Sequence, residues 1–288
     1  MLVSRLKNFA LILALLSVSQ IVIAQDSRPN KAKKTAAMKV TKKEISFKSL
    51  DGLQLTADLY AGNLLNENSP FILLCHQAGW SRGEYVAIAP KLVAMGFNCL
   101  ALDQRSGGGI NDVANKSVAA AKKKGLPTLY LDARQDIIAA LQFVKKKHAK
   151  GKLIVWGSSY SSALVLEIVG NKPDLADGVL SFAPGEYFSR FGKTDHFVRD
   201  GAKKLKVPVF LTGSKSETAG SVKMIADSMK LGKKLHFFKP KSRGNHGSRA
   251  LWKKFGDSQD YWNAVTKFLD THFPRQSATS KPSKKMKK

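Results

Sequence analysis

A short run of small residues at 157–161 has the composition of a nucleophilic site. The segment KLIVW-GSSYSS-ALVLEIV (152–169) combines an apolar strand, a tight turn and an apolar helix. Gly157, Ser159 and Ser161 fit the nucleophile-elbow pattern G-x-S-x-G, with Ser in place of the last Gly. A Ser on such a strained turn needs small neighbours two residues away on each side. The turn also places Ser159 at a helix N-terminus, where free amides and the helix dipole favour a developing oxyanion.

The alternative is an ordinary packing turn without chemistry, because small-x-Ser-x-small is a common pattern. Its place between an apolar strand and an apolar helix favours Ser159 as a nucleophile. Ser158 is the poorer candidate, since its neighbours two residues away are the bulky Trp156 and Tyr160.

The elements that must position this turn can be predicted along the chain. Residues 44–49 and 53–60 alternate apolar and polar side chains around Asp51-Gly52, which is typical of a hairpin. Six short apolar runs follow, typical of strands buried on both faces, at 71–75, 97–102, 152–156, 178–182, 207–212 and 234–238. Helical patterns lie between them, at 84–95, 129–149, 160–170, 216–231 and 257–272. We therefore predict an α/β fold with a mostly parallel eight-stranded sheet and helices on both faces.

Four motifs in this order resemble the α/β-hydrolase superfamily, in particular its dienelactone-hydrolase-like branch with a minimal lid. They are SLDGLQL in the hairpin, CHQAGWSRGEY after the third strand, LALDQRSGGG after the fourth and GSSYSS after the fifth. The resemblance covers residues 44–274 and implies an α/β-hydrolase fold with a short lid. It also implies that the catalytic residues follow the chain order nucleophile, acid, His.

The resemblance implies a Ser-His-Glu triad. The family places its His after the last strand, where His246 lies in the small-residue loop KSRGNHGSRALW. It places the acid after the strand at 207–212, where the loop GSKSETAG offers Glu217. A Glu can replace Asp because its task is to fix the His tautomer and stabilise the imidazolium. Asp195 is the alternative acid, and Glu217 is otherwise an ordinary carboxylate in the first turn of a helix.

Two backbone amides are implied as the oxyanion hole, those of Gln77 and Tyr160. Gln77 stands where the family has Gly, but only an amide is required. His76 is then a structural, hydrogen-bonded loop residue. Asp103 and Arg105 are expected to form a structural ion pair or to organise their loop, with a substrate contact of Arg105 as the alternative.

The connection at 186–206 is too short for a bulky lipase-type lid. We expect a shallow and fairly open site, with Trp80, Tyr187 and Phe188 as substrate-rim residues. Tyr160 and Phe191 are further aromatic candidates, and all five could equally be packing residues. A site of this kind favours small or accessible esters over buried long-chain lipids.

Residues 1–24 are typical of a signal peptide, with a basic start, an apolar run at 9–16 and small residues before a cut at Gln25. An uncleaved anchor is the alternative, but polar residues at 17–20 interrupt the apolar run. No Cys follows the run, so a lipid anchor is not expected. The sequence therefore predicts a periplasmic or secreted protein.

Composition bears on location more than on chemistry. The 288 residues carry a formal charge of +27, and 43% are hydrophobic, which excludes a wholly disordered chain. We predict a basic disordered linker at 25–43 and a basic disordered tail at 275–288, each about +6, which leaves about +13 on the domain at 44–274. Such Lys-rich tails suit an anionic envelope surface. No specific nucleic-acid partner is expected, because no basic patch is interleaved with aromatic residues.

The sequence as a whole predicts an exported serine hydrolase, in the first place a carboxylesterase that forms an acyl-enzyme and needs no cofactor or metal. Two alternatives stay open: a non-catalytic binding protein held on an anionic envelope surface, and a serine peptidase of the oligopeptidase-related type. Cys75 and Cys99 lie on strands that the family places side by side. We expect two buried free thiols there, with a disulfide as the alternative.

Overall fold

The computed structural model of the chain describes residues 38–275. The predicted signal peptide, most of the predicted linker and nearly all of the predicted C-terminal tail lie outside the described residues. The account below concerns residues 38–275 alone.

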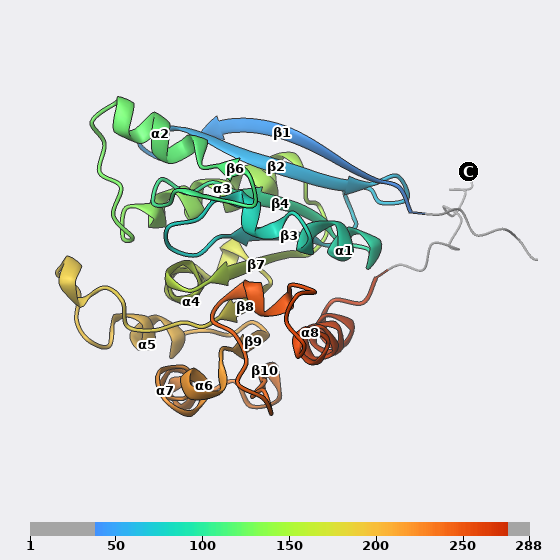
Figure 1. The fold of residues 1–288 in the computed structure, drawn as a ribbon, viewed down its shortest axis with the longest axis vertical. Coiled ribbons are helices and arrows are strands. Elements are labelled where there is room, and N and C mark those ends of the chain that lie inside the picture. Colours follow the sequence, from blue (N-terminus) through green and yellow to red (C-terminus); the bar gives the residue numbers. More distant parts are fainter. Residues whose placement is uncertain (1–37, 276–288) are drawn as a thin grey trace, which may run out of the picture. The chain divides into compact units, whose positions relative to one another are not determined.

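An eight-stranded sheet forms the centre of the described residues, with the strand order β1-β2-β4-β3-β7-β8-β9-β10 (Figure 1). Strand β2 pairs antiparallel with β1 and β4, and all other pairs of this sheet are parallel. The strands are β1 (Val40–Lys48), β2 (Gln54–Gly62), β3 (Phe71–Cys75), β4 (Asn98–Leu102), β7 (Leu153–Ser158), β8 (Gly178–Phe182), β9 (Val209–Thr212) and β10 (Leu235–Phe237). A two-stranded ribbon, β5 (Gly109–Ile110) and β6 (Val113–Ala114), lies apart from this sheet.

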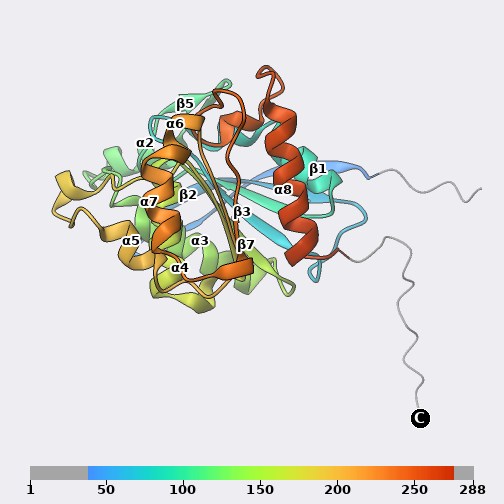
Figure 2. The same ribbon diagram turned by 90° about the horizontal axis from the view of Figure 1, so that it is seen from below.

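Helices cover both faces of the sheet. They are α1 (Ile88–Ala94), α2 (Lys116–Lys123), α3 (Ala133–Lys147), α4 (Tyr160–Asn171), α5 (Phe197–Ala202), α6 (Lys215–Ala219), α7 (Ser221–Ser228) and α8 (Ser258–His272). Helices α3, α4, α5 and α7 contribute to one apolar cluster, and α1 and α8 contribute to another. Figure 2 shows α3, α4 and α7 on one side of the sheet and α1 and α8 on the other.

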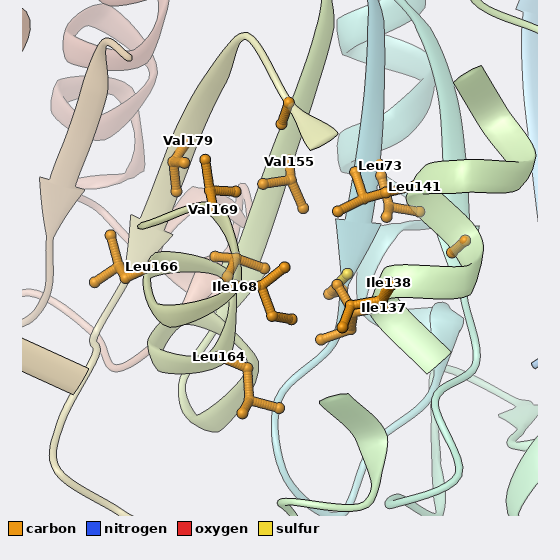
Figure 3. Close-up of a cluster of buried hydrophobic side chains, with 14 of the residues drawn as sticks. Leu73, Ile137, Ile138, Leu141, Val155, Leu164, Leu166, Ile168, Val169 and Val179 are labelled. Carbon is orange, nitrogen blue, oxygen red and sulfur yellow. The ribbon is translucent and has the colours of Figure 1, made fainter. Parts of the chain in front are cut away.

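The apolar strand sequences explain why both faces must be covered. Every residue of β3, β4, β7 and β8 is buried. Because successive side chains of a strand point to opposite faces, Leu73 and Val155 join the cluster of α3 and α4, whereas Leu74 and Trp156 join that of α1 and α8. Figure 3 shows the first of these layers, in which α3 and α4 pack against β3, β7 and β8. Each fully buried aliphatic side chain contributes about 1.5–3 kcal/mol.

The predicted fold class is confirmed: the eight strands, their mostly parallel order and the helices on both faces are all present. The predicted start of the domain at residue 44 was wrong. Strand β1 begins at Val40, so residues 40–43 belong to the sheet and not to the linker. An edge strand tolerates exposed lysines, so its basic composition concealed it. The predicted helix 216–231 is two helices, α6 and α7, which meet at Gly220.

Asp103 and Arg105 belong to separate ion clusters. Arg105 is fully buried, with its guanidinium 2.7 Å from Asp136 and 2.6 Å from Asp51. Asp103 instead lies 2.5 Å from a guanidinium nitrogen of Arg82. The predicted Asp103–Arg105 ion pair is therefore wrong, because Asp51, Asp136 and a serine hydroxyl occupy the donors of Arg105. The alternative prediction, that both residues organise their loop, agrees with these contacts.

Arg105 joins the hairpin turn to α3. Its hydrogen bonds hold the pKa of Asp51 at about 2, well below the ordinary range. Burial raises the pKa of Asp136 in spite of the same guanidinium. Both carboxylates depend on this one cation for compensation.

Two further features concern the predicted membrane and redox properties. No helix between residues 38 and 275 is long and apolar enough to cross a membrane.

Cys75 and Cys99 are buried free thiols on the neighbouring strands β3 and β4, as predicted. Burial raises the pKa of both thiols.

Replacing Arg105 by Leu should lower the free energy of unfolding by about 3–5 kcal/mol, because it leaves the buried Asp136 without a cation. Urea denaturation would measure the change. Lys152→Leu is the matched control: it removes an exposed partner of Asp177 and should cost at most about 1 kcal/mol. Equal losses in the two variants would contradict a special contribution from Arg105.

Candidate active site

Ser159 occupies a strained turn between β7 and α4. Its φ of 57° and ψ of −122° lie in a region that costs a non-glycine residue on the order of 1–3 kcal/mol. The turn is fixed from both sides, since Ser159 N–H donates to the carbonyl oxygen of Phe182 in β8 at 2.8 Å. A Cβ on Gly157 would lie 2.5 Å from the carbonyl oxygen of Ser161, so this position requires glycine.

Ser161 occupies the position of the last Gly in the elbow pattern, and its hydroxyl forms hydrogen bonds with backbone groups. Its Oγ lies 2.7 Å from the carbonyl oxygen of Cys75, 2.9 Å from that of His76 and 2.9 Å from that of Ser158. It also accepts the N–H of Ser158 at 3.0 Å. The hydroxyl therefore ties the elbow to the end of β3.

Three predicted catalytic side chains meet at the carboxyl edge of the parallel strands. Nε2 of His246 lies 2.8 Å from Oγ of Ser159, and its Nδ1 forms a hydrogen bond with Oε1 of Glu217. The alternative acid, Asp195, is 88% exposed, and its salt bridge is with the neighbouring His196. The geometry thus brings together Ser159, His246 and Glu217 and leaves Asp195 outside.

The carboxylate of Glu217 is held by its own helix. Its Oε2 accepts the N–H of Ser214 at 2.7 Å, and its N–H donates to the Ser214 hydroxyl at 3.4 Å, which forms a capping box at the start of α6. Burial raises the pKa of Glu217, but the hydrogen bonds from His246 and Ser214 outweigh it, and the pKa lies below its ordinary value. Glu217 is therefore an ionised acceptor for the His246 ring.

The His246 loop is attached to the elbow through its backbone. Gly247 has a φ of 71°, a left-handed conformation that favours glycine. The next amide, that of Ser248, donates to the hydroxyl of Ser158 at 2.8 Å, and the Ser248 hydroxyl accepts the indole N–H of Trp156 at 2.8 Å. These contacts fix the ring of His246 relative to Ser159.

The two predicted oxyanion amides differ in their availability. Tyr160 is the first residue of α4, so its N–H has no partner within the helix. The N–H of Gln77 donates to Oε2 of Glu84 at 2.8 Å, so the assignment of Gln77 was wrong. Ala78, the next residue, lines the cavity of Ser159, and its amide has no hydrogen-bond partner among residues 38–275.

His76 is a structural residue, as predicted. It is completely buried, and burial lowers its pKa to about 4, so the ring is neutral near pH 7. Its Nδ1 lies 2.8 Å from the carbonyl oxygen of Gln77, and its Nε2 accepts the N–H of Gln104 at 3.2 Å. The ring therefore joins the loops that follow β3 and β4.

A cavity of ≈ 420 Å³ opens in front of Ser159. Its lining residues are Ala78, Tyr130, Ser159, Tyr160, Glu186, Tyr187, Ser189, Arg190 and His246. A second recess, of ≈ 920 Å³, shares His246 and includes Arg243 and Arg249. His246 thus lines both recesses, whereas Ser159 lines only the first.

Of the aromatic rim candidates, Tyr187 and Tyr160 line the cavity of Ser159. Trp80 instead stacks on Trp252, with ring centres 5.2 Å apart, and Phe188 is buried against Phe197. Both rim predictions were wrong because aromatic residues in a loop can pack as well as bind. Tyr130, Glu186 and Arg190 also line the cavity but belong to no sequence motif; their only signal is a position in the lid or shortly before α3.

The arrangement can activate a hydroxyl for attack on a carbonyl carbon. His246 is placed to accept the Ser159 proton, Glu217 fixes the tautomer, and backbone amides are available for an oxyanion. Within residues 38–275, no three His, Cys, Asp or Glu side chains are grouped so that they could hold a metal ion.

Comparison with known proteins gives an independent view of the fold. A family model described as "Serine aminopeptidase, S33" matches residues 66–193, a range that contains Ser159 but not Glu217 or His246. No curated protein matches the chain.

Several solved structures share this fold at low sequence identity. A dienelactone hydrolase from Anabaena variabilis superposes with a TM-score of 0.59 at 14% identity, covering 81% of this chain and 98% of its own. A carboxyl esterase from Bacillus coagulans gives 0.60 at 12% identity, covering 81% and 99%. An acylaminoacyl peptidase from Pyrococcus horikoshii gives 0.57 at 16% identity, covering 86% of this chain and 44% of its own. At these identities the likeness concerns the fold.

Replacing Gly157 by Ala should lower the free energy of unfolding by about 1–3 kcal/mol, because the added Cβ meets backbone atoms of the elbow at 2.5 Å. Thermal or urea denaturation would measure this. Gly256→Ala is the matched control, since nothing lies within 4 Å of its Cβ position. A Gly157→Ala variant as stable as the wild type would rule out this backbone path.

Proposed function

We propose that this chain, which belongs to the α/β-hydrolase superfamily, hydrolyses carboxylic esters through an acyl-enzyme formed on Ser159. The hydrolase- and esterase-like fold supports a serine hydrolase or esterase in general. One observation supports ester hydrolysis at Ser159 in particular. Ser159 lies on a strained turn, lines a cavity and is hydrogen-bonded to His246, which is hydrogen-bonded to Glu217.

The proposed reaction begins with attack of the Ser159 oxygen on the carbonyl carbon while His246 Nε2 takes the hydroxyl proton. The carbonyl π electrons move to oxygen, and the amides of Tyr160 and Ala78 stabilise this oxyanion. As the tetrahedral intermediate collapses, His246 gives its proton to the departing alcohol oxygen. Glu217 stays ionised throughout and stabilises the imidazolium.

Water completes the proposed cycle. It attacks the acyl carbon, and His246 now takes the proton from water and returns it to the Ser159 oxygen as the acid leaves. We assign the second recess, which shares His246, as the exit of the alcohol and the entry of the water.

The cavity supports small or accessible esters as substrates. Its volume of ≈ 420 Å³ lies in the lower part of the range for small-molecule sites. The lid contains only a single turn at Ser189–Phe191 and the six-residue helix α5, which gives little apolar cover for a long acyl chain.

A serine peptidase activity is the second candidate, and the match to the serine aminopeptidase model favours it. The same triad cleaves esters and amides, so the two candidates differ in substrate and not in mechanism. Parallel assays with a short p-nitrophenyl ester and with aminoacyl p-nitroanilides would separate them.

Export and attachment to an anionic envelope surface are further parts of the proposal, supported by the residue pattern of 1–24 and the lysines of the terminal segments. N-terminal sequencing of the mature protein tests export. A start at Gln25 would support it, and an intact Met1 would contradict it.

A fluorophosphonate probe should label Ser159, and Ser159→Ala or His246→Ala should abolish both labelling and hydrolysis of a short p-nitrophenyl ester. Glu217→Gln should lower kcat on the order of 10⁴-fold, since it disturbs the His tautomer. Mass spectrometry of labelled peptides identifies the site. A folded protein that neither reacts with the probe nor turns over esters would favour a non-catalytic binding function.

A further inference from the structure

Glu84 is a buried carboxylate with no role in the triad. It follows β3 in a short 3-10 helix (Arg82–Tyr85) and is completely buried. Its side-chain oxygens take part in hydrogen bonds, but they form no salt bridge with any residue between 38 and 275. A buried carboxylate without a cation is costly, so its retention calls for a physical reason.

Three loops of the active site meet through Glu84. Its Oε2 accepts the N–H of Gln77 at 2.8 Å, in the loop that carries the oxyanion amide. Its Oε1 accepts the hydroxyl of Ser158 at 2.7 Å, directly before the nucleophile. The same hydroxyl oxygen accepts the N–H of Ser248 at 2.8 Å, two residues after His246.

This pattern of hydrogen bonds fits the ionised form of Glu84. The Ser158 oxygen accepts from Ser248, so its single proton is free to point at Glu84. The other carboxylate oxygen already receives an amide N–H. Both oxygens therefore act as acceptors, which is the role of a carboxylate and not of a neutral acid.

The environment of Glu84 balances opposing effects. Burial raises its pKa to about 7, whereas the hydrogen bonds from Ser158 and Gln77 and the charges of His246 and Arg249 lower it. The other groups that face it, the hydroxyls of Tyr85 and Tyr160, have pKa values raised above their ordinary range and stay neutral near pH 7. A negative charge here attracts the imidazolium that forms on His246 during the reaction.

We propose that Glu84 is a positioning residue whose carboxylate aligns the oxyanion loop and the His246 loop on the nucleophile turn and favours the imidazolium of His246. By drawing the Gln77 amide away from Ser159, it leaves the Ala78 amide as the one beside the cavity. This inference rests on the proposed ester hydrolysis at Ser159.

Glu84→Gln keeps the shape of the side chain and removes its charge, so it is the decisive variant. For a short p-nitrophenyl ester we expect kcat to fall by about tenfold to a hundredfold with little change in KM, because the loss concerns alignment and not substrate contact. Ser158→Ala removes the hydroxyl that joins Glu84 to the Ser248 amide but keeps the hydrogen bond between Glu84 and Gln77, and it should give a smaller loss. The double variant should lose less than the two single losses combined, since both act through one network.

The pH profile supplies a readout that a merely structural role would not change. Protonation of His246 stops the reaction and protonation of Glu84 slows it, so log(kcat/KM) of the wild type should rise with a slope steeper than 1 over part of the acid side. In Glu84→Gln the slope should be 1.

Stability should also report the ionisation of Glu84. Its folded pKa is raised, so its contribution is full below the unfolded value near 4.5 and is lost as pH rises through about 7. Glu84→Gln should therefore gain stability relative to the wild type across this window.

Glu167→Gln is the matched control. It neutralises another buried carboxylate, which belongs to α4, pairs with Arg134 at 2.7 Å and does not line the cavity of Ser159. It should lower stability and leave the acid slope of the pH profile unchanged. Wild-type kcat and an unchanged slope in Glu84→Gln would overturn the inference, whereas inactive wild-type protein would instead refute the proposed function.

A separate observation concerns Arg190 in the lid, which lines the cavity of Ser159. Its guanidinium carbon lies 4.9 Å from the ring centre of Tyr130 and 4.8 Å from that of Phe191. Tyr130 in turn stacks on Tyr160, next to the nucleophile, at 4.7 Å. Stacking uses the faces of a guanidinium and leaves its edge N–H donors free.

Glu186 is the one carboxylate among the residues that line the cavity of Ser159, and its oxygens already have hydrogen-bond partners. Glu186 accepts the N–H of Val198 at 2.8 Å and that of Arg199 at 3.0 Å, and it also pairs with the Arg199 side chain. Among residues 38–275, Arg190 forms no salt bridge. The cavity therefore presents an oriented cation whose charge is not neutralised by its neighbours.

We infer that Arg190 forms a subsite for an anionic group on the acyl part of the ester, with a carboxylate as its simplest ligand. This inference also rests on the proposed ester hydrolysis. A planar fork of donors suits a carboxylate, which it can bind through two hydrogen bonds. Arg243 and Arg249 line the other recess, which shares His246, and would serve the leaving alcohol instead.

The test compares p-nitrophenyl half-esters of glutaric, adipic and suberic acids with the same compounds capped as methyl esters. The wild type should favour the anionic member at one or more chain lengths, and Arg190→Gln should lower that preference by roughly fivefold, as expected for a partly exposed ion pair. The readout is the ratio of kcat/KM for the anionic ester to that for the neutral ester, so a change that affects both substrates equally does not alter it.

Lys193→Gln is the control for general electrostatic attraction, because it removes another exposed lid cation that does not line the cavity. It should leave the preference intact. Equal anionic-to-neutral ratios in the wild type and Arg190→Gln at all three lengths would overturn the subsite. Failure of the wild type on the neutral esters would count against the proposed function.

Discussion

The strained backbone at Ser159 is the constraint on which the rest of the site depends. A serine in this conformation persists only where neighbouring contacts over-determine it. Here β8 fixes its amide, Gly157 leaves room for the backbone of Ser161, and the Ser161 hydroxyl joins the turn to β3. The two contacts that reach beyond the turn come from β3 and β8, the strands on either side of β7. The sheet order is therefore a requirement of the nucleophile and not merely its background.

Buried carboxylates link the loops that emerge from this edge of the sheet. Asp136 meets Arg105, which also binds the more exposed Asp51, and Asp103 meets Arg82. Glu84 receives hydrogen bonds from the loop after β3 and from the residue before the nucleophile. Apolar packing, such as that of α3 and α4 against the sheet, stabilises the domain but has little directional preference. Hydrogen bonds to charged groups specify direction, which a site that works at distances near 3 Å requires.

The sequence predicted those features that depend on local pattern. Continuous apolar runs identified the parallel strands, and small residues between a strand and a helix identified the turn at Ser159. The loops of His246 and Glu217 followed from family resemblance, and the structure brings both side chains to Ser159.

Features that depend on distant partners were missed. Which way the Gln77 amide points is decided by Glu84, seven residues later, and whether Trp80 binds or packs is decided by Trp252 at the other end of the domain. The pairing of Arg105 depends on Asp136 in a helix that its own motif does not include. Local pattern cannot contain this information, because it arises only when the chain has folded.

The two ends of the described chain have a consequence for how the domain can be tethered. Met38 and Arg275 line one common recess together with Pro70 and Lys152, which directly precede β3 and β7. This is the amino end of the parallel strands, whereas Ser159 follows the carboxyl end of β7. A surface, a partner or an engineered tag attached through either terminus would connect to the domain at the amino end of the parallel strands. The cavity of Ser159, at their carboxyl end, would then face away from the attachment and towards solvent.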